Sequence, residues 1–204
     1  MEQYDEAQVT SLAWSFLRSN TTGTLRFGEN MQDINYVIAH DGFLIMPAMV
    51  AMLQPCNTIM YVPDYSNDCM EMHVSLQQFQ EDESTGAYAD RWRVYHGEPR
   101  DVQWAKVAID AARFRDMFVD GEGMQESNPL SEVESKLCKQ INKEFSDSLK
   151  ACCLAKTNVT IDAPLVVGID SLGIDVRAQF GIVRIPAEQL FQTSDDVLKL
   201  LKTY

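Results

Sequence analysis

Residues 169–177 read Ile-Asp-Ser-Leu-Gly-Ile-Asp-Val-Arg, and residues 183–186 read Val-Arg-Ile-Pro. Branched apolar side chains alternate here with Asp and Arg, and the segments stop at Gly or Pro, which is typical of short strands with tight connections. The sequence therefore predicts two or three strands over residues 164–170 and 174–185.

Helical patterns lie on both sides of these predicted strands. Ser131 and Glu134 have the spacing of a capping box, and apolar residues continue from there at helical spacing to about Lys156. Residues 193–196, Thr-Ser-Asp-Asp, open a second, short helix. A helix, a small sheet and another helix make a compact α+β unit.

Residues 121–130 read as a linker. The residues before this linker have a different pattern. Residues 5–19 have the apolar spacing of an amphipathic helix, and Asp41-Gly42 suits a type I′ hairpin turn. Residues 103–119 are ambiguous between helix and strand, and their aromatic content favours strand. The other predicted strands cover residues 24–27, 34–39, 43–48, 57–62, 69–79 and 91–96, and several short antiparallel strands at this spacing indicate a barrel.

Composition and charge limit the classes of function. The 204 residues carry a net charge of −13, with −12 in residues 1–130 and −1 in residues 131–204, which disfavours nucleic acid and anionic lipid as partners. No apolar run reaches the length of a membrane helix, so we expect a cytoplasmic protein. The five cysteines show no Cys-x-x-Cys spacing, so neither a disulfide framework nor a metal site is predicted.

Two groups of residues resemble a known family. Thr22-Gly23-Thr24-Leu25, then residues 92–97 and 118–123, are similar to the barrel strands of the pyridoxamine-phosphate-oxidase-like, FMN-binding split-barrel proteins. Residues 169–177 and 183–186 resemble the Asp-x-x-Gly-(Leu/Ile)-Asp-(Leu/Val)-Arg…Arg-(Ile/Val)-Pro signature of the C-terminal domain of heme-utilisation proteins. The two matches together span nearly the whole chain.

The resemblance implies a mainly β plus α+β fold, in which a split β-barrel precedes a small C-terminal α+β domain. The expected boundaries are residues 1–126 for the barrel and 127–204 for the second domain. The resemblance also implies a homodimer. Members of the group bind FMN, heme or neither, so the residues present must decide between these cofactors.

Positive charge is scarce where FMN would bind. The 64 residues from Phe27 to Asp90 contain no Lys or Arg but ten Asp or Glu, whereas a flavin phosphate needs cationic or backbone donors. Arg91 and Arg93 are the candidate anion ligands, with Arg26 as a further one. Their alternative role is a solvated strand face paired with neighbouring acids, so FMN binding in the usual mode is disfavoured.

Heme iron requires an imidazole, thiolate, thioether or phenolate. Heme-binding relatives often carry a His-Met-Asn-x-Asp-His run on the first helix of the C-terminal domain. Gln140 and Phe145 stand at its two histidine positions, although Asn142 matches. His73 and His96 are the remaining candidate ligands, and each could equally be a hydrogen-bonded or surface histidine.

We therefore expect a split-barrel protein without the usual FMN and heme ligands. A binding or regulatory role linked to heme, tetrapyrrole or iron handling, with a protein partner, is the leading interpretation. The alternatives are an FMN-dependent oxidoreductase with an unusual phosphate site, which is the enzyme to expect if the chain is one, and a heme-binding protein. The sequence identifies no catalytic residue.

Overall fold

A computed structural model describes residues 5–100 and 103–204 of the chain. Contacts divide the chain into two units, Met1–Ser127 and Asn128–Tyr204. The first unit contains α1 (Glu6–Arg18), β1 (Thr22–Phe27), β2 (Asn30–Asn35), β3 (Val37–Ile38), β4 (Leu44–Ala48), η1 (Val50–Leu53), β5 (Thr58–Val62), β6 (Met70–Phe79), α2 (Gly86–His96), β7 (Gln103–Phe114), β8 (Met117–Asp120) and η2 (Glu122–Met124).

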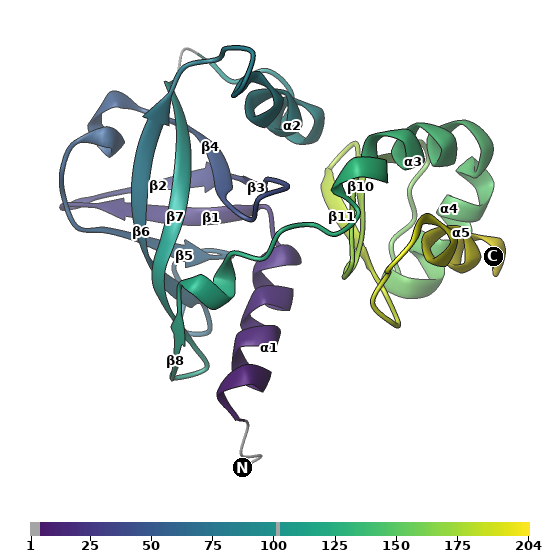
Figure 1. Cartoon of the computed structure of the whole chain (residues 1–204), viewed down its shortest axis with the longest axis horizontal. Helices are drawn as coiled ribbons and strands as arrows, with labels where there is room; N and C mark the ends of the chain where they lie inside the picture. Colours follow the sequence, from purple (N-terminus) through teal and green to yellow (C-terminus); the bar gives the residue numbers. More distant parts are fainter. Residues whose placement is uncertain (1–4, 101–102) are drawn as a thin grey trace. The chain divides into compact units, whose positions relative to one another are not determined.

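The first unit is a curled antiparallel sheet, as the resemblance implied, with α1 and α2 beside it (Figure 1). The strand order is β2-β1-β5-β6-β7-β4-β3, and β8 also pairs with β7. One side of the long strand β7 pairs with β6, while the other side pairs first with β4 and then with β8. The strand interpretation of residues 103–119 is therefore confirmed, as is the split-barrel fold class.

Apolar spacing explains how α1 packs. Asp5 caps the helix by accepting a hydrogen bond from the Gln8 backbone N–H at 2.8 Å, and the Gln8 side chain accepts one from the Asp5 N–H. Val9, Ala13 and Leu17 repeat at four-residue intervals and are all buried. Burying a side chain such as Leu17 contributes roughly 2 kcal/mol. The predicted amphipathic helix over residues 5–19 is confirmed.

The turn predicted at Asp41-Gly42 and the turn between β7 and β8 differ in type. The turn at Asp41-Gly42 is not type I′, because only Gly42 has a positive φ, 86°. Its N–H donates to the Ala39 carbonyl, so the loop is a three-residue turn that ends on a left-handed glycine. Arg115 and Asp116 form the two-residue loop between β7 and β8, and both have positive φ, 51° and 62°, as a type I′ turn requires.

The second unit holds α3 (Ser131–Glu144), α4 (Ser146–Thr157), β9 (Leu165–Asp170), β10 (Gly173–Ala178), β11 (Gly181–Pro186) and α5 (Ser194–Lys202). Its sheet has the order β11-β10-β9 and is antiparallel throughout. The predicted strands and the final helix are confirmed. The core residues of this unit are Leu130, Leu137, Ile141, Leu149, Cys152, Cys153, Ile161, Val166, Ile169, Ile174, Val176, Val183, Ile185, Phe191, Val197 and Leu201.

Two helix predictions in the second unit need correction. The single helix expected from residue 131 to 156 is interrupted at Phe145, where α3 ends and α4 begins. Ser131 and Glu134 do not form a capping box, because the N-cap is Leu130 and the Glu134 carboxylate bonds elsewhere. Thr193 and Asp196 do form one at the start of α5.

None of the helices among residues 5–100 and 103–204 combines the length and the apolar character needed to span a membrane.

Candidate binding site

The helix α2 carries three of the four predicted cofactor residues: Arg91, Arg93 and His96. The prediction of a strand over residues 91–96 is wrong. Ala89, Trp92 and Tyr95 are the buried residues of α2, and they recur at the three-residue spacing of a helix face. The alternation of Trp92 and Val94 with Arg93 and Tyr95 suggested a strand only because six residues are too few to separate the two periods.

Arg93 is held by acidic side chains of the same unit. Its two terminal nitrogens donate to the two Glu81 oxygens, each at 2.7 Å, and its Nε donates to Glu98 at 3.0 Å. The hydrogen bonds to Glu81 are the main reason that the pKa of Arg93 is raised. The guanidinium also lies 5.3 Å from the centre of the Trp104 ring. Arg93 is therefore paired with neighbouring acids, which was the alternative to an anion-binding role. It lies on a helix and not on the expected strand.

Arg91 is used to tie α2 to the sheet. Its Nε donates to the Ile38 carbonyl at 2.8 Å, and one terminal nitrogen donates to the Tyr95 hydroxyl at 3.4 Å. The guanidinium lies 5.5 Å from the Tyr95 ring centre. These contacts leave Arg91 in a structural role at the junction of α2 and β3.

His96 bonds to the backbone. Its Nε2 lies 3.2 Å from the Tyr36 carbonyl oxygen, which can only accept, so Nε2 carries a proton and is the donor. Burial lowers the pKa of His96, which keeps the ring neutral. The ring lies 5.0 Å from that of Trp92. The backbone therefore engages Nε2, and the aromatic neighbours hold the ring in place.

His73 lies apart from the other three candidates. It is exposed on β6, opposite Ile59 of β5 and Ala111 of β7. The structure thus brings Arg91, Arg93 and His96 onto one helix but does not assemble the four candidates into one site. Arg91 and Arg93 already donate to protein oxygens, and His73 is exposed and apart from the other candidates.

Sequence reasoning missed a cluster formed by Asp41, Tyr88 and Lys106, which we call the Asp–Tyr–Lys cluster. The Lys106 ammonium donates to the Asp41 carboxylate at 2.8 Å and to the Tyr88 hydroxyl at 3.2 Å. The Tyr88 hydroxyl donates to the same Asp41 oxygen at 2.6 Å. The three side chains come from the β3–β4 turn, α2 and β7.

Burial and hydrogen bonding shift the pKa values of Asp41 and Lys106 in opposite directions. Burial alone would raise the pKa of Asp41, but the hydrogen bonds from Lys106 and Tyr88 outweigh it and hold that pKa below its ordinary value. Burial would lower the pKa of Lys106, and its bonds to Asp41 and Tyr88 raise it instead. The bond to Asp41 raises the pKa of Tyr88. At neutral pH the cluster therefore holds an ammonium, a carboxylate and a protonated phenol.

Aromatic rings surround the cluster. The Lys106 nitrogen lies 3.8 Å from the centre of the Phe43 ring, and the Phe79 ring lies 5.8 Å from that of Tyr88. The side chains of Lys106 and Asp41 keep 24% and 37% of their exposure. A partly exposed cation between aromatic rings can bind a polar ligand group. The sequence signal was Lys106 itself, the single base in the otherwise apolar run from Trp104 to Ile109.

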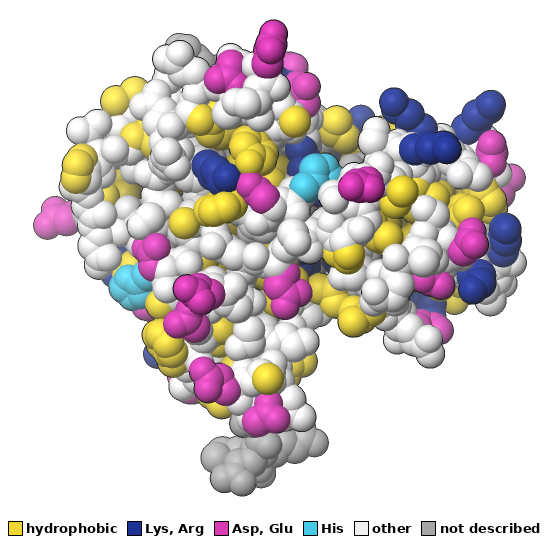
Figure 2. Space-filling view, in the orientation of Figure 1, with side chains coloured by type: hydrophobic (Ala, Val, Ile, Leu, Met, Phe, Trp, Pro, Cys, Tyr) yellow, Lys and Arg dark blue, Asp and Glu magenta, His cyan; other side chains and the backbone are white. Residues whose placement is uncertain are grey.

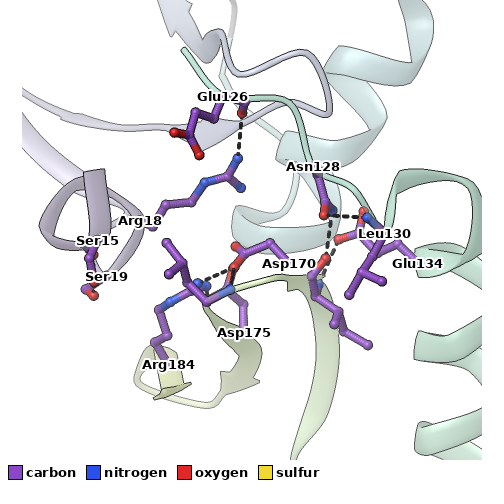
Figure 3. A network of polar contacts seen from close by, with 12 residues as sticks. Ser15, Arg18, Ser19, Glu126, Asn128, Leu130, Glu134, Asp170, Asp175 and Arg184 are labelled. Atoms are coloured by element: carbon purple, nitrogen blue, oxygen red, sulfur yellow. Dashed lines mark hydrogen bonds and ion pairs between the residues drawn. The ribbon is translucent and has the colours of Figure 1, made fainter. Parts of the chain in front are cut away.

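The signature residues of the second unit form a buried ionic triad, Asp170–Arg184–Asp175. Arg184 of β11 donates to Asp170 of β9 at 2.6 Å and to Asp175 of β10 at 2.8 Å (Figure 3). Burial would lower the pKa of Arg184, but the charges of Asp175 and Asp170 raise it. The triad joins all three strands of the sheet, so the motif has a structural role.

Polar side chains also bond to the outer backbone of β9. Asn142 of α3 accepts from the Val166 N–H at 2.7 Å and donates to the Val166 carbonyl at 2.9 Å. Glu134 accepts from the Ile169 N–H, and Asn128 donates to the Ile169 carbonyl, both at 2.8 Å (Figure 3). The asparagine that matched the heme-binding run therefore serves as a backbone clamp.

Surface charge differs between the two units. Figure 2 shows acidic side chains spread over the barrel and a group of Lys and Arg side chains over α3. Lys136, Lys139 and Lys143 of α3 are exposed. No group of three or more His, Cys, Asp or Glu side chains suited to a metal ion occurs within residues 5–100 and 103–204.

No protein-family model matches the chain, and no curated protein matches it in sequence. Among solved structures, a protein of unknown function from Agrobacterium tumefaciens superimposes with a TM-score of 0.71 at 12% identity, over 96% of this chain and 94% of that one. A heme-binding protein from Mycobacterium smegmatis gives a TM-score of 0.45 at 13% identity over 100% and 98% of the two chains. ChuZ of Campylobacter jejuni gives 0.44 at 14% over 59% and 58%.

Proposed function

We propose that this chain is a non-enzymatic binding or regulatory protein built on the split-barrel, pyridoxamine-phosphate-oxidase-like fold, with a second unit of the heme-utilisation type. The observation that carries the proposal is the engagement of Arg91, Arg93 and His96 by protein groups. Each of them already forms an internal hydrogen bond that competes with an external ligand.

The wider assignment is part of the same proposal. The protein acts as a homodimer in the cytoplasm, in a process linked to heme, tetrapyrrole or iron handling. Exposed apolar side chains of the barrel, such as Phe118 at 70% exposure and Val50 at 65%, support a second copy as partner. None of the five cysteines forms a disulfide, which suits a reducing compartment.

The visible spectrum of the purified protein tests the proposal. We expect no flavin band and no Soret band on purification, and no saturable change when FMN or hemin is added. An FMN titration that saturates and is abolished in Arg93→Ala, but kept in Arg100→Ala, would contradict the proposal. Arg100 is a suitable control because it is exposed and outside α2.

Hemin binding is tested in a separate titration. A Soret band that disappears in His73→Ala or His96→Ala would show that the replaced histidine ligates heme and would contradict the proposal. The exposed His40→Ala variant is the matched control. Sedimentation of the unmodified chain at micromolar concentration tests the homodimer, and a monomer there would refute that part of the proposal.

A further inference from the structure

A cavity of about 330 Å³ lies where the β7–β8 hairpin, the end of α1 and the segment before β6 meet. Phe16 and Phe114 form its aromatic wall, and their ring centres are 5.2 Å apart. Its polar lining comes from Asn67, Asp68, Cys69, Arg113, Arg115 and Asp116. The volume is at the small end of the range of ligand pockets, roughly 300–1,000 Å³, which indicates a small ligand.

The turn that delivers Arg115 to this cavity places that residue in a costly backbone conformation. Arg115 and Asp116 both adopt left-handed backbone conformations, which L-residues other than Asn and Asp rarely do. Asn-Gly is the usual pair in such a turn. An arginine kept in this conformation is a reason to look for a role of its side chain.

Two opposite charges in the cavity have no ion-pair partner among the described residues. The Arg115 guanidinium lies over the Phe114 ring at 5.1 Å, and within the described part of the chain no carboxylate pairs with it. Asp68 is exposed and likewise has no ion pair there. Arg113 differs, because it pairs with Glu71 at 3.1 Å and approaches Asp116 at 3.8 Å.

We propose that this cavity binds a small zwitterion, namely a free amino acid with an apolar side chain. The ligand carboxylate pairs with Arg115, its ammonium group pairs with Asp68, and its side chain packs on Phe16 and Phe114. A simple anion would leave Asp68 unpaired beside it, and a simple cation would leave Arg115 unpaired. The inference goes beyond the proposed binding role, because it concerns a surface separate from α2 and names a ligand class.

Titration of the whole chain with L-leucine, followed by amide chemical shifts, tests the proposal. We expect saturable shifts for residues 67–69 and 113–116 at millimolar leucine. Leucinamide, which lacks the carboxylate, and 4-methylpentanoate, which lacks the ammonium group, should each bind about tenfold more weakly or worse, because each loses one charge-assisted contact.

Two variants locate the site. Arg115→Asn with Asp116→Gly supplies the preferred turn residues, so it should fold with an unchanged or higher melting temperature and still lose leucine binding at least tenfold. Asp68→Asn should also lose it, and Arg100→Ala should bind like the parent chain. Leucine binding that survives the turn variant would overturn the proposal.

Binding of the two leucine analogues can also contradict the proposal. Equal binding of 4-methylpentanoate and leucine would make this an anion site, and equal binding of leucinamide would make it a cation site. Either result, or no saturable shift with leucine, would overturn the proposal. None of these results would change the FMN and hemin spectra, so failure here is distinguishable from failure of the proposed function.

Discussion

The ionic triad of the second unit and the Asp–Tyr–Lys cluster of the barrel use similar groups in different surroundings. The side chain of Arg184 is 8% exposed and those of its two partners 6% and 11%, whereas Lys106 and Asp41 keep 24% and 37%. A buried charge depends on its partner, because water cannot replace it. The partly exposed cluster keeps contact with water, so its stability depends less on the internal partner. Residues of a signature motif can thus be structural, while residues outside any motif form the more accessible charged cluster.

Loss of Arg184 should have the largest effect. Arg184→Ala leaves Asp170 and Asp175 buried without their cation, and we expect a loss of about 3–5 kcal/mol of unfolding free energy. Trp14, Trp92 and Trp104 all lie in the first unit. The urea transition followed by far-ultraviolet circular dichroism should therefore move to lower urea concentration. The transition followed by tryptophan fluorescence should keep its midpoint.

The control for this change removes all three charges. Asp170→Asn and Asp175→Asn combined with Arg184→Met should recover a large part of the loss, since no unpaired charge remains. A loss below about 1 kcal/mol in Arg184→Ala would contradict the structural role of the triad.

Asn142→Ala should have an intermediate effect. It removes two hydrogen bonds and leaves the Val166 N–H and carbonyl without those partners, so we expect a loss of about 2 kcal/mol. Gln140→Ala, which removes only an exposed bond to Glu144, should change stability by less than about 0.5 kcal/mol. Equal effects of the two variants in urea unfolding would show that Asn142 is not a clamp.

Asp41→Asn should have the smallest effect, about 1 kcal/mol or less, because the cluster is partly exposed. The pKa of Asp41 is held below its ordinary value of 3.8 in the folded chain. Its contribution is thus complete above that ordinary value and is lost as the pH falls through the lower, folded value. Tryptophan fluorescence in urea at neutral pH and near pH 3 measures this.

The comparison variant is Asp33→Asn, which replaces an exposed carboxylate that accepts a hydrogen bond from the Thr24 hydroxyl and has no ion pair among the described residues. Asp33→Asn should keep the acid-dependent fall in stability that the parent chain shows, and Asp41→Asn should show a smaller fall. The same pH dependence in the parent chain and in Asp41→Asn would contradict the ionic role of the cluster.

Much of the fold could be predicted because long apolar patterns agree with it. Met70, Met72 and Val74 alternate along β6, and Val9, Ala13 and Leu17 repeat along α1. Predictions from short segments were wrong where the helix and strand periodicities cannot be distinguished. Residues 91–96 alternate like a strand, yet the helix is recognisable only when Ala89 is added to Trp92 and Tyr95.

The candidate site was harder to predict, because its groups meet only through the tertiary fold. Asp41, Tyr88 and Lys106 are far apart in sequence, and nothing local links them. Glu134 has the spacing of a capping box with Ser131, but the nearby strand β9 offers its carboxylate the Ile169 N–H instead. A local motif indicates which hydrogen bonds a side chain can form. The residues packed around it in the folded chain determine which of these bonds forms.

The clamps on β9 have a consequence for self-association. A strand at the border of a sheet normally presents free amides and carbonyls that can recruit a strand from another molecule. Asn128, Glu134 and Asn142 occupy those positions at Val166 and Ile169. The small sheet is therefore closed to strand addition along β9, which protects the second unit from growing into intermolecular aggregates at that border.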